Sequence, residues 1–143
     1  MQAARSSPAV AARAARSSPP EVLPAQARLR RRPEFTAVVR SGRRAGRPTM
    51  VLHYLPERPG ALDGVVPSAR VGLVVGRAVG NSVVRHRVSR RLRAAAAEQL
   101  HRIPVTADLV LRARPEAAAA DFGTLHADLA RGLDRLLGVG SPR

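Results

Sequence analysis

The feature that most constrains this fold is a stretch, residues 64–97, that contains seven arginines and no aspartate or glutamate. Within it, apolar residues recur at spacings of four, four and three, which predicts an amphipathic helix with one narrow apolar stripe. The stripe consists of Val84, Val88, Leu92 and Ala95. Asn81 can cap the helix through its side-chain oxygen, and Pro104 ends the element, so we expect a helix over about Ser82–His101.

The remaining surface of this helix is cationic. Ordinary solvated helices alternate the sign of charge because residues four apart are neighbours, whereas Arg87 and Arg91 carry the same sign. At about 100° per residue, we expect an outer side of His86, Arg87, Arg90 and Arg93, with Arg85 and Arg91 flanking the stripe. A solubilising surface is the simple alternative, but arginine pairs with phosphate oxygens and stacks on bases. We therefore favour a phosphate-binding face over a solubilising or membrane-surface helix.

Composition supports a polyanionic partner. The 143 residues carry a net charge of +15, and all 25 basic side chains are arginine. The absence of cysteine excludes disulfide frameworks, thiolate zinc sites and cysteine nucleophiles. No apolar run is long enough for a transmembrane helix, no signal-peptide core is visible, and we expect no membrane partner and a cytoplasmic location. The four histidines are widely spaced and the carboxylates sparse, so we expect no catalytic residue and no metal site in the protein.

Domain boundaries follow from proline and charge. Residues 1–27 are rich in Ala, Arg, Ser and Pro, which predicts a disordered basic tail; an organellar transit peptide is the less favoured alternative. We expect one folded domain over residues 28–137 and a short flexible tail over 138–143.

The domain shows further helix and strand signals. We expect a helix over Pro33–Arg40, a last helix within Asp121–Leu137, and a loop over Pro56–Pro67. The expected strands are Thr49–Leu55, Val71–Val75 and Ala107–Ala113, with a further β segment near Val65–Val66. Phe122 and the leucines of the last helix share one face and are expected in the core.

The run VGLVVGRAVGNSVVRHRVSRRLR, residues 71–93, resembles the signature of the bacterial ribonuclease P protein family. In that signature a strand and a short basic turn precede Gly-Asn and a helix with basic positions, matched here by Gly80-Asn81 and by Arg85, Arg87, Arg90 and Arg93. The runs RLRRRPEFTAVVRSGRRAGRP and LVLRARP resemble the first helix with its following segment and the strand before the last helix. The resemblance covers about residues 28–137 in the same order.

The resemblance implies an α+β fold, a two-layer sandwich with the order helix, three strands, helix, strand, helix and a left-handed strand–helix–strand crossover. It implies the non-catalytic protein subunit of a ribonucleoprotein, ribonuclease P, whose RNA subunit removes the 5′ leader of precursor tRNA. The implied partners are the catalytic RNA and precursor tRNA, without an obligate protein partner, and the implied cofactor is Mg²⁺, held mainly by RNA and substrate.

The resemblance also implies two sets of site residues. Contacts to the catalytic RNA are expected from Arg77, Asn81, Arg85, His86, Arg87, Arg90, Arg91 and Arg93. A cleft for the single-stranded leader is expected at Phe35, Val39 and His53. Phe35 has a second reading as an ordinary core residue, and His86, Ser89, Val39 and His53 depart from the residues usual in the family.

Two other functions remain open at this point. A general basic RNA-binding protein, of ribosomal or chaperone type, would explain the charge but would leave the Gly80-Asn81 helix opening a coincidence. A protein-only nuclease would need a catalytic constellation, for which the sequence offers no candidate.

Overall fold

The computed structural model describes residues 23–60 and 68–138. Along the chain lie α1 (Arg32–Ser41), β2 (Arg43–Gly46), β3 (Met50–Leu55), β4 (Arg70–Val74), α2 (Ser82–Gln99), β5 (Asp108–Ala113) and α3 (Phe122–Leu137). Short 3-10 turns occupy Ala25–Ala27, Leu100–Arg102 and Pro115–Ala119. The predicted order of helix, three strands, helix, strand, helix is confirmed.

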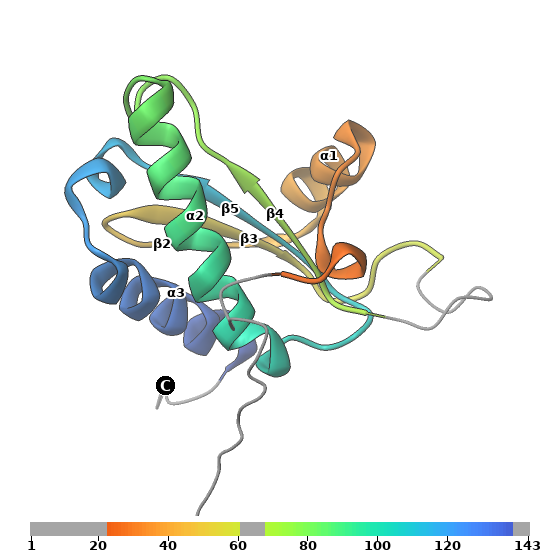
Figure 1. The fold of residues 1–143 in the computed structure, drawn as a ribbon. Coiled ribbons are helices and arrows are strands. Elements are labelled where there is room, and N and C mark those ends of the chain that lie inside the picture. The colour runs from red at the N-terminus through yellow and green to blue at the C-terminus, as the bar shows by residue number, and fades with distance from the viewer. Residues whose placement is uncertain (1–22, 61–67, 139–143) are drawn as a thin grey trace, which may run out of the picture.

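The sheet has the strand order β2-β3-β5-β4. β3 pairs antiparallel with both β2 and β5, whereas β5 pairs parallel with β4. The connection from β4 through α2 to β5 crosses in the left-handed sense, against the usual preference, and α2 and α3 lie on one face of the sheet while α1 lies on the other (Figure 1). This topology separates two surfaces, one on α2 and one beside α1.

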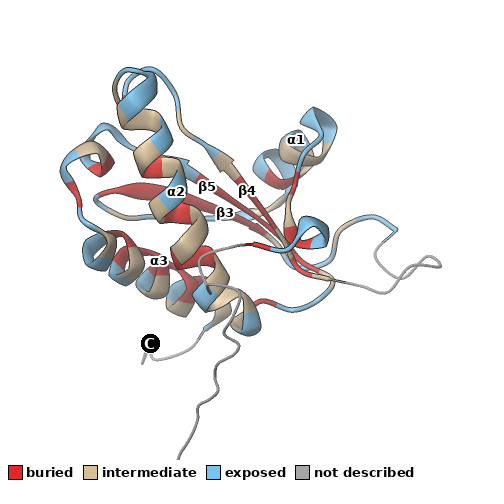
Figure 2. Cartoon of the chain, in the orientation of Figure 1, coloured by how far each residue is buried: buried red, intermediate tan, exposed pale blue. Residues whose placement is uncertain are grey.

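The main core lies between the sheet and the helices α2 and α3. Strand alternation directs Met50, Leu52 and Tyr54 of β3 to this side, where they join Val88 and Leu92 of α2 and the leucines of α3. A Cβ built on Gly132 would lie 2.7 Å from both δ carbons of Leu52, so glycine there lets α3 approach β3. Figure 2 shows the buried residues concentrated along the strands and the inner sides of these helices.

A smaller core holds α1 against the opposite face of the sheet. It consists of Leu29, Val38 and Val110, with Phe35 and Leu55 packed at its margin. The Phe35 ring lies directly over Gly72 of β4, because a Cβ built there would come within 2.5 Å of two ring carbons. Gly72 therefore fixes how closely the aromatic ring of α1 approaches the sheet.

The structure differs from the sequence expectations at two boundaries. β2, with the sequence Arg-Arg-Ala-Gly, was not located, since charged residues and glycine give no β signal. Residues 23–27, placed in the tail, form a turn whose Leu23 and Ala27 are buried in the core. The segment Val65–Val66, the rest of the amino-terminal tail and residues 139–143 lie outside the described residues. Among the described helices, none is long and apolar enough to cross a membrane.

Candidate nucleic-acid interface

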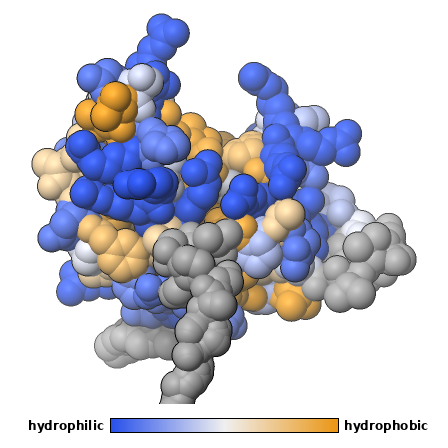
Figure 3. Space-filling model, in the orientation of Figure 1, coloured by the Kyte–Doolittle hydropathy of each residue, from blue (hydrophilic) through white to orange (hydrophobic). Residues whose placement is uncertain are grey.

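The cationic surface of α2 begins at a capped helix start. Asn81 Oδ1 accepts a hydrogen bond from the Val84 backbone N–H at 3.0 Å, as expected for an N-cap. Val88, Leu92 and Ala95 are buried and Val84 half-buried, so the predicted apolar stripe is confirmed. We call the arginines that remain outside it the α2 arginine surface: Arg85, Arg87, Arg90, Arg91 and Arg93. Figure 3 shows hydrophilic side chains gathered over α2.

Two of these arginines are anchored on neutral carbonyl oxygens. Arg87 Nη2 donates to the Ala118 carbonyl at 3.3 Å and Arg91 Nη1 to the Ala120 carbonyl at 2.8 Å. Arg87, expected on the outer side, is therefore half-buried beside the turn before α3, whereas Arg90 and His86 are exposed. A carbonyl restrains a guanidinium without cancelling its charge, so both cations are positioned in advance and stay available to an anion.

The α2 arginine surface has no carboxylate of its own. Among the described residues, salt bridges within 4.0 Å involve Arg47, Arg58, Arg70, Arg102, Arg114 and His126, and none involves an arginine of α2. Asp121 lies close enough that Arg91, after hydrogen bonds from Thr124, helps to lower the pKa of its carboxyl. Arg77 and Asn81 are exposed before the helix, so they extend the same cationic edge.

The residues expected at the leader cleft lie on the α1 side but in different environments. Phe35 is half-buried over Gly72, while Val39, one helical turn later, is 49% exposed. His53 of β3 is only 5% exposed, and its Nε2 has no hydrogen-bond partner among the described residues. Burial, with Arg112 and Arg44 nearby, lowers the pKa of His53 below its ordinary value of 6.5. His53 is therefore a buried neutral side chain rather than an open platform for a base.

Phe35 also lines a pocket with three cations. The pocket has a volume of about 240 Å³ and its lining includes Phe35, Arg28, Arg30 and Arg93. An aromatic ring beside guanidinium groups is the arrangement that binds unpaired nucleotides. Val39 and His53 do not line this pocket, so the structure brings Phe35 together with basic residues and not with the other two predicted cleft residues.

An ion-pair network centred on the buried Asp108 links α1 to the sheet, and no local sequence pattern predicts it. Asp108 is 2% exposed and accepts two hydrogen bonds of 2.8 Å from Arg70, with Arg58 Nη1 at 3.4 Å. Arg70 Nη1 also contacts Glu34 Oε2 of α1 at 2.9 Å. Burial acts to raise the pKa of Glu34, but the Arg31 backbone N–H and Arg70 outweigh it and lower that pKa. The partners are more than thirty residues apart in sequence, so no local pattern reveals them.

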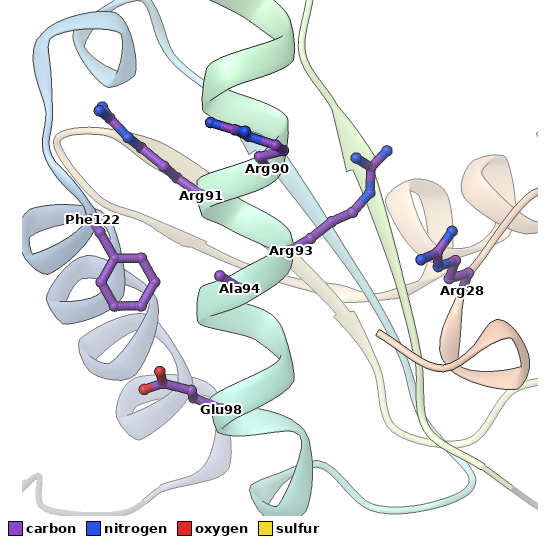
Figure 4. Close-up of a pocket in the computed structure, with 7 residues that line it drawn as sticks. All are labelled: Arg28, Arg90, Arg91, Arg93, Ala94, Glu98 and Phe122. Atoms are coloured by element: carbon purple, nitrogen blue, oxygen red, sulfur yellow. The ribbon is translucent and has the colours of Figure 1, made fainter. Parts of the chain in front are cut away.

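Phe122 lies in a more open position than the sequence predicts. It is expected in the core, but the structure places it half-buried at the margin of the main core. There it lines a pocket with Ala94, Glu98 and four arginines, Arg28, Arg90, Arg91 and Arg93 (Figure 4). Its ring stacks on His126 with centroids 5.6 Å apart and an interplanar angle of 28°. The sequence does contain a hint of this position, because Phe122 is the first residue of α3. A side chain at the end of a helix is covered by fewer neighbours than one in its middle.

The described residues do not form a metal site. They contain no group of three histidine, aspartate or glutamate side chains that could hold an ion. The buried carboxylates are engaged elsewhere, since Asp108 pairs with arginines and Asp128 accepts from the Thr49 backbone N–H and hydroxyl. Within residues 23–60 and 68–138, the carboxylates and histidines therefore do not form a set of ligands that fits Mg²⁺.

Fold and surface together define a class: a small basic α+β protein with a helix whose arginines have no carboxylate partner in the part of the chain that the structure describes. Comparison with known proteins agrees. The sequence model of the family described as Ribonuclease P matches residues 23–137. The chain is 46% identical over 125 residues to the ribonuclease P protein component of Streptomyces bikiniensis, covering 84% of this chain and 99% of that protein. It is 49% identical over 115 residues to that of a Nocardioides species, covering 80% and 95%.

Solved structures give the same result. The ribonuclease P protein from Thermotoga maritima superposes with a TM-score of 0.62 at 25% identity, covering 76% of this chain and 96% of that one. The Staphylococcus aureus protein superposes with a TM-score of 0.63 at 18% identity, covering 76% and 94%, which supports the fold alone. The chain belongs to the ribonuclease P protein family. It is accordingly an RNA-binding subunit of ribonuclease P that serves tRNA processing, and a general RNA-binding role is not favoured.

Proposed function

We propose that the chain binds the catalytic RNA of ribonuclease P through the α2 arginine surface and the 5′ leader of precursor tRNA on its α1 side. In this assignment the RNA subunit catalyses hydrolysis of the phosphodiester bond, and the protein supplies binding and orientation. Mg²⁺ belongs to the RNA and the substrate. We place the complex in the cytoplasm, where bacterial tRNA precursors are processed.

The observation that carries this proposal is the lack of carboxylate partners for the α2 arginines among the described residues. A guanidinium forms paired hydrogen bonds with phosphate oxygens. Each phosphate neutralised releases condensed counter-ions, so affinity falls steeply as salt rises. Because Arg87 and Arg91 already donate hydrogen bonds to carbonyls, their side chains lose little conformational freedom when they bind phosphate. The two fixed guanidinium groups can therefore bind a structured RNA in one orientation.

The α1 side supports leader binding through a different chemistry. The Phe35 ring lies in a pocket with Arg28 and Arg30, so a base can stack on the ring while its phosphates face the arginines. Phe35→Leu tests this contact. We expect about a tenfold loss of affinity for precursor tRNA, in line with about 1–3 kcal/mol for a base stacked on an aromatic ring, and no change for mature tRNA, which lacks a leader.

Reconstitution tests the proposal as a whole. The full chain is combined with a bacterial ribonuclease P RNA, and cleavage of precursor tRNA is followed as Mg²⁺ is lowered. The protein should lower the Mg²⁺ concentration needed for cleavage, because its arginines replace part of the charge screening otherwise supplied by ions. Absence of stimulation at any Mg²⁺ concentration would contradict the proposal.

A further inference from the structure

The surface between α2 and α3 combines a half-buried aromatic ring with members of the α2 arginine surface, and none of the RNA contacts proposed above uses the ring. Phe122 lies at the start of α3, partly packed against the main core and partly open. Figure 4 shows its ring beside Ala94 of α2, between Arg91 and Glu98, with Arg90 further along the helix. Among the described residues, the other two aromatic side chains lie elsewhere, Tyr54 in the main core and Phe35 on the far face.

The Phe122 ring is held in place by His126. His126 stacks on it and is itself fixed, because His126 Nε2 lies 3.0 Å from Gln99 Nε2 and 3.3 Å from Glu98 Oε1. Ala94 on the facing helix is small, which leaves the ring accessible from the α2 side. A fixed, partly exposed ring loses little freedom when a second planar group stacks on it.

The charges around the ring suit one type of occupant. Arg91 is anchored on the Ala120 carbonyl, two residues before Phe122, and Arg90 is exposed one position earlier on α2. A nucleotide offers both a planar base for the ring and a phosphate for the guanidinium groups. Glu98 lies at the other end of the surface, with its Oε1 3.3 Å from His126 Nε2, so the phosphate belongs at the Arg90 and Arg91 end.

We infer that Phe122, supported by His126, is a stacking site for an unpaired nucleotide of the RNA bound by α2, with Arg90 and Arg91 holding the adjacent phosphate. This inference rests on the proposed function, since it assigns one extruded base of the same RNA to the α2–α3 side. Stacking tolerates any base, so the site recognises an unpaired nucleotide in a fold rather than a sequence. It uses a different ring from the leader pocket, whose Phe35 lies on the opposite face of the sheet, and Arg28 and Arg93 line both pockets.

Phe122→Leu tests the inference in the complex of the full chain with the ribonuclease P RNA used for reconstitution. Leucine keeps an apolar contact with the core but removes the ring face. We expect about tenfold weaker RNA binding with an unchanged dependence of affinity on salt, because no phosphate contact is lost. Ultraviolet cross-linking of the wild-type complex, followed by mass spectrometry, should attach a nucleotide within the tryptic peptide 113–131.

A matched pair of variants keeps the test valid if Phe122→Leu disturbs folding. Ala94→Glu places a carboxylate beside the ring, whereas Ala127→Glu makes the same charge change on the exposed side of α3. Ala94→Glu should weaken RNA binding at least tenfold and Ala127→Glu less than threefold, with both proteins folded by circular dichroism.

The outcomes separate the two proposals. If the wild-type chain does not bind the RNA, the proposed function fails and this inference fails with it. If the wild-type chain binds, equal affinity of Phe122→Leu and wild type, or equal losses for the two glutamate variants, overturns the stacking site and leaves the proposed function intact.

Discussion

Arginines near α1 and arginines on α2 are the same residue type in opposite electrostatic situations. Beside α1, Arg70 and Arg58 converge on Asp108, which is 2% exposed, and Arg70 also contacts Glu34. On α2, Arg87 and Arg91 donate to carbonyl oxygens, and no described carboxylate lies within 4.0 Å of either guanidinium. The first pair has its counter-ion inside the fold and stabilises it, whereas the second has to find its counter-ion in another molecule. Under the proposed function, the presence or absence of an internal counter-ion, rather than the number of arginines, separates the arginines that stabilise the fold from those that bind RNA.

The largest expected effect comes from removing the internal counter-ion. Asp108→Asn leaves the partly buried Arg58 without a carboxylate and leaves Arg70 with Glu34 alone, which should lower the free energy of unfolding by about 3 kcal/mol. Urea unfolding measures this. The affinity of the folded fraction for RNA should keep its salt dependence, because no residue of α2 changes. A decrease in the free energy of unfolding below about 1 kcal/mol would mean that Asp108 does not stabilise the fold through Arg70 and Arg58, and the contrast with the α2 arginines would fail.

The next effect is on RNA binding. Arg90→Ala should weaken binding of the catalytic RNA and lower the salt slope of log affinity by about one, as expected for one lost phosphate contact. Its free energy of unfolding should stay within about 0.5 kcal/mol of wild type, because Arg90 is exposed. Arg131→Ala is the charge-matched control, since Arg131 is exposed on α3. Equal slopes for the two variants would show that net charge alone governs binding.

Arg87→Ala sharpens the comparison within α2 itself. Unlike Arg90, Arg87 donates to the Ala118 carbonyl, so its removal should cost about 1 kcal/mol of stability as well as RNA affinity. Thermal unfolding of the two alanine variants side by side measures the difference. Identical unfolding temperatures would indicate that the carbonyl contact does not anchor the side chain.

The smallest effect is confined to acid conditions and concerns His53. Because burial, Arg112 and Arg44 lower its pKa in the folded state, the unfolded chain binds a proton first as the pH falls. The contribution of His53 to stability is therefore complete above about pH 6.5 and is lost between that value and its lower folded pKa. His53→Phe should flatten the fall in unfolding free energy between pH 7 and pH 5. An unchanged profile would show that other groups dominate this range.

Local patterns predicted the elements that carry their own signal. The spacing of Val84, Val88 and Leu92 placed α2 within two residues of its observed end, and Asn81 marked its cap. The sequence does not predict β2, because its pairing with β3, and not its composition, makes it a strand. The order of elements and the left-handed crossover came from the resemblance, since no spacing rule gives handedness.

For the site, too, local sequence patterns predict only the residues that lie on one element. The arginines of α2 follow from helix geometry, but the carbonyls that hold Arg87 and Arg91 belong to a turn about thirty residues later. The burial of His53 in the sheet and the half-burial of Phe122 at the start of α3 depend on how the layers pack. Such contacts between distant segments are invisible in a single sequence.

The position of β5 has a consequence for the order in which the chain folds. β5 lies between β3 and β4 although it follows both in the sequence, so β4 lacks its neighbour in the sheet until residues 108–113 arrive. A nascent chain that ends before Asp108 has only the β2–β3 hairpin to build on, and a two-stranded hairpin is marginal by itself. Assembly of the sheet therefore waits until Asp108–Ala113 has left the ribosome, with parallel pairing across a helix as its slow step.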